Sequence, residues 1–119
     1  MTPTDEFAVE LRELLDEEIP QDGTDADTGF TDERIDALLE RAVNIHAAAA
    51  EGWRRKAARI QRRLTDIASY QVGGERYDRV NLQTALSAAL EVAKTFDEQA
   101  AAAAGGGSRV LEYSLPEVV

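Results

Sequence analysis

The residues best suited to chemistry are the closely spaced carboxylates of segment 22–32, which are Asp22, Asp25, Asp27 and Asp32. An EF-hand calcium loop needs oxygen ligands at positions 1, 3 and 5, glycine at position 6 and glutamate at position 12. Counting from Asp25 places Gly29 at position 5 and Phe30 at position 6, so the glycine is misplaced. We expect a solvated loop whose acids cap helices, with calcium binding as the alternative.

A second chemical feature is the run of six basic residues between Arg54 and Arg63. Such a cluster on one helix can contact phosphates, which makes a nucleic-acid-associated helical module one hypothesis for the function. The chain has no basic tail, and Tyr70 is the only stacking residue near the cluster. An acidic section of the same chain or of a neighbouring copy would neutralise these charges equally well, and we favour this interpretation.

The single histidine, His46, falls on the apolar side near the start of a predicted helix, and the chain has no cysteine. Without a second histidine or a cysteine nearby, His46 is expected to be a packed or interfacial residue. No nucleophile with its base, phosphate-binding glycine loop or pair of catalytic carboxylates is recognisable. We therefore expect no enzymatic activity, no catalytic or metal-binding residues and no cofactor.

The net charge of −10 is unevenly distributed. Residues 1–40 carry −12, residues 41–94 carry +5 and residues 95–119 carry −3. The overall acidity argues against a protein that coats DNA. Alanine supplies 20 of the 119 residues, so the core should be thin and completed by association with further copies. No apolar run approaches the ~20 residues that cross a bilayer, so we expect no membrane partner and no signal peptide.

Four helices are predicted from apolar residues that recur with a period of 3.6 residues. They cover about 5–18, 31–44, 45–69 and 79–104. Thr31 is expected to cap the second helix. Leu82, Leu86, Ala89, Leu90, Ala93, Phe96 and Ala100 are expected to form the buried side of the fourth.

The helix 45–69 is strongly amphipathic. Its apolar arc includes His46, Trp53 and Ala57, and its opposite arc carries Arg55, Lys56, Arg59, Arg62 and Arg63. Gly52 lies inside the helix, where glycine costs up to ~1 kcal/mol relative to alanine. Beside Trp53, a glycine would leave room for a neighbouring helix.

Two segments complete the expected fold. Residues 70–78 contain Gly73-Gly74 between short β-prone pieces, which predicts a small hairpin or extended loop. Gly105-Gly106-Gly107-Ser108 predicts a hinge. The predicted fold class is all-α: a small four-helix bundle with an extended hairpin or loop near 70–78 and an extended C-terminal tail. The expected domains are a helical domain, 1–104, and a Gly-hinged tail, 105–119.

The order of several motifs resembles the head-to-tail adaptor (connector) proteins of tailed bacteriophages. Leu11-Arg12-Glu13-Leu14-Leu15, then Ile19-Pro20, then Phe30-Thr31-Asp32-Glu33 are similar to the N-terminal half of that family. Ala49-Ala50-Glu51-Gly52-Trp53-Arg54-Arg55-Lys56-Ala57 is similar to its Ala-x-Glu-Gly-Trp-x-x-Lys-Ala helix. The resemblance covers about residues 8–68, and the motifs are loose patterns and not catalytic signatures.

The resemblance implies a virion protein of the neck, present in the host cytoplasm during assembly. It implies a homo-oligomeric ring of twelve copies beneath the portal protein. Such a ring extends the DNA channel, helps to retain packaged DNA without sequence-specific binding, and docks the next neck or tail-completion protein.

Two groups of interface residues follow as hypotheses. The electrostatic subunit interface is assigned to four bases and four acids: Arg55, Arg59, Arg62, Arg63, Asp16, Glu17, Asp32 and Asp36. Since terminal segments of related adaptors reach the portal, the portal contact is assigned to the tail residues Arg109, Val110, Leu111, Tyr113 and Leu115.

Overall fold

The fold is a helical bundle, described here from a computed structural model. The structure describes the backbone of residues 1–70 and 75–105 and the side chains of residues 1–66 and 79–104. The four α-helices are α1 (Asp5–Leu15), α2 (Asp32–Arg41), α3 (Ile45–Tyr70) and α4 (Glu75–Gly105), and a 3-10 turn, η1 (Asp25–Asp27), lies between α1 and α2. These ranges contain no strand, which confirms the predicted all-α class.

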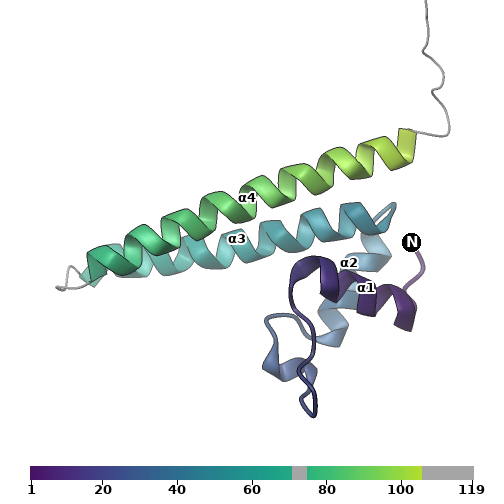
Figure 1. Cartoon of the computed structure of the whole chain (residues 1–119), viewed down its shortest axis with the longest axis horizontal. Helices are drawn as coiled ribbons and strands as arrows, with labels where there is room; N and C mark the ends of the chain where they lie inside the picture. Colours follow the sequence, from purple (N-terminus) through teal and green to yellow (C-terminus); the bar gives the residue numbers. More distant parts are fainter. Residues whose placement is uncertain (71–74, 106–119) are drawn as a thin grey trace, which may run out of the picture.

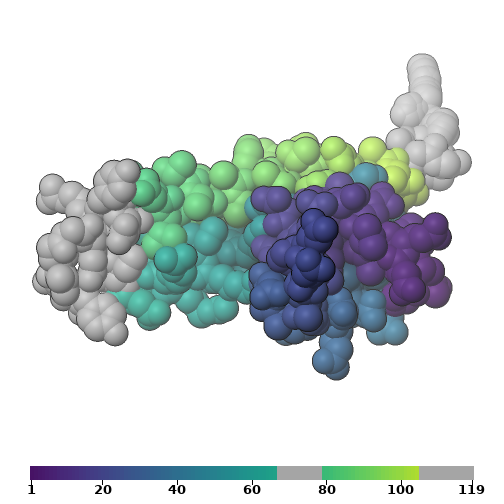
Figure 2. All heavy atoms as spheres, turned by 60° about the horizontal axis from the view of Figure 1, so that its bottom comes forward, coloured from purple at the N-terminus to yellow at the C-terminus, as the bar shows by residue number. Residues whose placement is uncertain are grey.

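The long helices α3 and α4 run antiparallel as a hairpin, and α1, η1 and α2 pack against one half of it (Figure 1). We call residues 5–41 the N-terminal module. The half of the hairpin that the module does not cover, residues 60–70 and 75–87, is called the arm. Figure 2 shows the module gathered over one end of the hairpin while the arm extends past it. The radius of gyration is 18.0 Å, against about 13 Å for a compact domain of this length.

The ends of the helices follow from local hydrogen bonds. The side chains of Thr4 and Thr31 accept hydrogen bonds from the first turns of α1 and α2, so the predicted cap at Thr31 is confirmed. Helix α1 ends at Leu15, earlier than the predicted residue 18, because Asp16 adopts a left-handed conformation with φ 58°. Asn44 directly precedes α3 and caps it, because its Oδ1 accepts a hydrogen bond from the N–H of Ala47.

The main core joins α1 and α2 to the first half of α3. Its buried members are Leu11, Leu15, Phe30, Ile35, Leu38, Leu39, Ala48 and Ala49. Helix α1 packs closely against α3 at Gly52, which is buried against Leu15. A Cβ atom at position 52 would meet the side chain of Leu15, so the predicted role of Gly52 in making room for a neighbouring helix is confirmed.

The hairpin itself is held by small side chains. The buried apolar residues outside the main core are Ala50 and Ala57 of α3 and Ala89, Ala93 and Ala100 of α4. Leu90 was expected on the buried side of α4, but it is 50% exposed, because it lies at the margin of that side. Val80 is also about half exposed. The thin, alanine-rich packing expected from composition is therefore found along this hairpin.

The predicted hairpin or loop near 70–78 lies partly outside the described residues, because its centre is 71–74. On either side, α3 continues to Tyr70 and α4 begins at Glu75 instead of the predicted Arg79. The predicted tail lies outside the described residues from 106 onward.

Candidate interaction surface on α3

The basic side of α3 meets the N-terminal module at Lys56. The Lys56 ammonium lies 2.9 Å from Oε2 of Glu17 and donates a hydrogen bond to the backbone carbonyl of Leu15 at 2.6 Å. It also lies 4.3 Å from the centre of the Trp53 ring, a cation–π distance. Lys56 therefore holds the end of α1 against α3, which is a structural role.

Glu17 is the matching acid and joins three segments. Its Oε1 accepts a hydrogen bond from the N–H of Gly29 at 2.7 Å, while Oε2 pairs with Lys56. Burial by itself would raise the pKa of Glu17, but the Gly29 hydrogen bond, the Lys56 pair and the nearby charge of Arg59 together hold this pKa below its ordinary value. Glu17 is thus an ionised tether between the loop before α2 and helix α3.

Arg59 lies one turn beyond Lys56 and is held by an aromatic ring. Its guanidinium lies 4.6 Å from the centre of the Phe30 ring. Its Nη1 is also close to Gly29, since a Cβ atom at Gly29 would come within 2.6 Å of it. The loop before α2 therefore orients Arg59, leaving its charge at the edge of the module.

The bases at the start of the cluster have acidic partners on the hairpin. Arg54 pairs with Glu51 at 3.1 Å and with Asp97 of α4 at 2.7 Å. Burial would lower the pKa of Arg54, but the hydrogen bonds to Asp97 and Glu51 raise it. Arg55 lies 3.7 Å from the other oxygen of Glu51. These two arginines are neutralised within the hairpin.

The last two bases of the cluster stand apart. Arg62 and Arg63 are exposed, and neither has an ion pair with any residue whose side chain the structure describes. Together with Arg59 they line an open hollow of about 440 Å³, where Asp66 is the one acid among the described lining residues. This end of α3 therefore carries an excess of positive charge at the start of the arm.

The four predicted interface acids behave differently from one another. Glu17 pairs with α3 as described, whereas Asp32 forms an ion pair with Arg12 at 2.9 Å instead of with a base of α3. Asp16 supplies the left-handed end of α1, and Asp36 is exposed on α2. Of the four acids, Asp16 and Asp36 have no ion pair among the side chains that the structure describes. The predicted portal-contact residues Arg109, Val110, Leu111, Tyr113 and Leu115 lie outside the described residues.

Sequence reasoning missed Arg12, which is 4% exposed. Its guanidinium donates hydrogen bonds to the carbonyls of Glu17 and Phe30 and to Thr28 Oγ1, besides pairing with Asp32. A lone arginine among the apolar residues of α1 was the available signal. This side chain organises the loop from the end of α1 to the start of α2.

The acidic loop 22–32 uses its carboxylates as caps. Asp27 Oδ2 accepts a hydrogen bond from the Thr24 N–H, and Asp25 Oδ2 accepts one from the Asp32 N–H, each at 2.8 Å. In the part of the chain with described side chains, no three His, Asp or Glu residues are grouped so that they could hold a metal ion. The capping interpretation of this loop agrees with these contacts.

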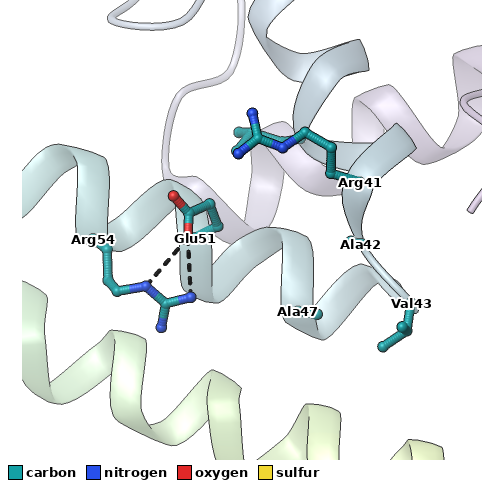
Figure 3. A pocket seen from close by; sticks show the side chains of 7 residues that line it. Arg41, Ala42, Val43, Ala47, Glu51 and Arg54 are labelled. Atoms are coloured by element: carbon teal, nitrogen blue, oxygen red, sulfur yellow. Dashed lines mark hydrogen bonds and ion pairs between the residues drawn. The ribbon is translucent and has the colours of Figure 1, made fainter.

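Two further features are structural in character. The ring of His46 stacks against Phe96 with centroids 6.4 Å apart, as expected for a packed residue. A hollow of about 290 Å³ lies between the end of α2 and α3, and Figure 3 shows Glu51 and Arg54 bonded to one another at its side. Arg41 lies on the opposite side of this hollow, whose other lining residues are apolar.

Comparison of the chain with protein-family models, with curated proteins and with solved structures finds no match. None of the helices, over the residues described, is both long enough and apolar enough to span a bilayer.

Proposed function

We propose that the chain is a structural head-to-tail adaptor of a tailed bacteriophage, which assembles as a ring beneath the portal protein. The observation that carries the proposal is the uncovered arm. None of the arm's side chains that the structure describes is buried, and Val80 is about half exposed, so the arm buries little apolar surface by itself. Packing of neighbouring copies side by side would bury this surface.

The position of the resembling motifs supports the same proposal. Leu11, Leu15 and Phe30 lie in the main core, and Gly52 and Trp53 form the contact between α3 and α1. The motifs that are similar to the adaptor family are therefore the residues that fix the module on the hairpin. A chain that keeps them keeps the framework on which an adaptor subunit would depend.

In the proposed ring, the channel for packaged DNA is lined without sequence-specific contacts, and the next neck or tail-completion protein docks on the side away from the portal. The tail residues Arg109, Val110, Leu111, Tyr113 and Leu115 are proposed to contact the portal. They follow α4, whose end lies beside the start of α3, since the Asn44 side chain donates a hydrogen bond to the Ala100 carbonyl. Helix α4 therefore ends, at Gly105, on the side of the hairpin opposite to the arm.

The alternative is a nucleic-acid-associated helical module that uses the cluster 54–63. One observation favours it: Arg62 and Arg63 are exposed and unpaired among the described side chains. Acids of the same chain, however, already form ion pairs with Arg54, Arg55 and Lys56. Since few bases remain for phosphates, we favour the adaptor.

The test combines the purified chain with the portal protein encoded in the same genome, and measures the mass of the complex by native mass spectrometry. A ring of identical copies on the portal is expected, and a truncated chain that ends at Gly105 should remain folded but bind the portal weakly. Absence of any complex with the portal would contradict the proposal. Binding to a fluorescent DNA duplex with a steep dependence on salt would favour the alternative.

A further inference from the structure

We propose that the basic end of α3, formed by Arg59, Arg62 and Arg63, binds an acidic stripe of α1, formed by Glu6, Glu10 and Glu13, on a second copy of the chain. The inference rests on the proposed function, because it names the two surfaces by which neighbouring subunits of the ring meet.

The basic surface consists of three arginines on neighbouring turns of α3. Arg59 is oriented by the Phe30 ring, and Arg62 and Arg63 project from the next turn of α3. Among the side chains that the structure describes, the hollow that these three arginines line holds one acid, Asp66. Because three positive charges face one negative charge, the surface favours an acidic partner.

The acidic surface is the outer side of α1. Glu6, Glu10 and Glu13 are spaced so that they share one face of the helix, opposite to the buried Leu11 and Leu15. All three are exposed, and none has an ion pair among the side chains that the structure describes. Val9 is one turn away from both Glu6 and Glu13 and is 60% exposed, which provides an apolar contact at the edge of the stripe.

The two surfaces cannot meet within one chain. The end of α1 is fixed at Gly52 and Lys56, and its start lies toward the end of α2, where the ammonium of Met1 donates a hydrogen bond to the carbonyl of Leu39. Helix α1 therefore lies over the first half of α3, and its acidic stripe faces away from α3. Arg63 lies seven residues beyond Lys56, which places it about 10 Å farther along α3 in the opposite direction.

A second copy can satisfy both surfaces because their spacings correspond. Glu6 and Glu10 are four residues apart, as are Arg59 and Arg63, so both pairs of charges repeat at about 6 Å along their helices. The contact joins different surfaces of identical chains, which generates a closed ring or a filament. Each copy then offers one free basic end and one free acidic stripe to its two neighbours.

The test is a charge exchange between two variants. Arg62→Glu with Arg63→Glu makes the α3 end acidic, and Glu10→Arg with Glu13→Arg makes the stripe basic. Each variant alone should associate at least about tenfold more weakly than the unaltered chain, because like charges now face one another. An equimolar mixture should recover association, since the acidic α3 end of the first variant is complementary to the basic stripe of the second, and the unaltered stripe and α3 end still pair.

Association is measured by sedimentation velocity at low salt and up to millimolar protein, with circular dichroism to show that each variant is folded. Matched controls reverse exposed charges elsewhere: Arg34→Glu with Lys94→Glu, and Glu91→Arg with Glu98→Arg. These controls should associate as the unaltered chain does. If the unaltered chain stays monomeric under these conditions, if both variants associate normally, or if their mixture does not recover, the pairing is overturned. A ring on the portal would still stand in each of those cases, and only its absence refutes the adaptor function.

Discussion

Gly52 of α3 lies directly against Leu15 of α1: a Cβ atom at position 52 would lie 2.9 Å from Cδ1 of Leu15 and closer still to Cδ2. This contact sets the distance between α1 and α3, and it is flanked by two bonds that depend on the same separation. The Trp53 indole N–H donates to the carbonyl of Leu14 at 3.0 Å, and Lys56 donates to the carbonyl of Leu15. The junction of the module with the hairpin therefore depends on a position without a side chain.

Gly52→Ala is expected to destabilise the chain by about 1–3 kcal/mol, because the added methyl group forces α1 away from α3. The direction of this change in stability is informative, because alanine is the better helix former and would stabilise an unconstrained site by up to ~1 kcal/mol. Urea unfolding followed by the fluorescence of the single tryptophan, Trp53, measures the change. Leu15→Ala in the Gly52→Ala background should recover part of the packing, so the two effects should not add. As a calibration, Ala58→Gly at an exposed site of α3 should show the propensity effect alone.

Arg12 is the next test, because its guanidinium holds the loop between α1 and α2 through four partners. Arg12→Lys keeps the charge but loses the planar fork, so it should lower the free energy of unfolding by about 2–4 kcal/mol. Asp32→Asn removes only the ion pair with an exposed carboxylate and should cost about 1 kcal/mol. Thermal unfolding by circular dichroism measures both. Equal losses in the two variants would show that the backbone hydrogen bonds of Arg12 contribute little.

Much of the fold could be predicted because it depends on local patterns. The apolar period of α2 and the caps at its start identify it directly, and Ile35, Leu38 and Leu39 are buried as that period requires. The end of α1 could not be predicted, because it depends on Asp16 adopting a left-handed conformation that sequence rules assign to glycine or asparagine. Leu90 was misplaced because periodicity gives the direction of a side chain but not whether another helix covers it.

The candidate surface was predicted less completely. A helical wheel groups the bases of α3 but does not show which acids reach them, so Lys56 was left out of the interface set although it makes the ion pair with Glu17. Asp32 was assigned to α3, but the partner is Arg12, because the loop 17–31 folds back and brings the start of α2 beside α1. Pairings of this kind depend on the path of a loop, which local periodicity does not determine.

Asn44 provides a prediction about the hairpin. Its Oδ1 caps α3 by accepting from Ala47, and its Nδ2 donates to the carbonyl of Ala100 on α4 at 3.2 Å. Asn44→Ala loses both bonds and should cost about 1–2 kcal/mol. Asn44→Asp keeps the cap and loses only the link to α4, so it should cost less than Asn44→Ala in denaturant unfolding. Hydrogen exchange at the end of α4 should quicken in both variants, and unchanged exchange there would show that the link to Ala100 is not needed.

The pH dependence of stability tests Glu17. Because its pKa is lower in the folded chain than the ordinary value of about 4.5, folding favours the ionised carboxylate. The stability that Glu17 contributes is therefore present above pH 4.5 and is lost as the pH falls through the lowered pKa. Glu17→Gln should cost about 1–2 kcal/mol at pH 7 and progressively less toward pH 3, as the unaltered chain itself loses the charged form.

Urea unfolding at each pH, read from Trp53 fluorescence, gives the difference between the two proteins. Glu18→Gln, an exposed neighbour, is the control and should change stability little at any pH. A difference between Glu17→Gln and the unaltered chain that stays constant from pH 7 to pH 3 would show that the ionised carboxylate does not tether the loop to Lys56.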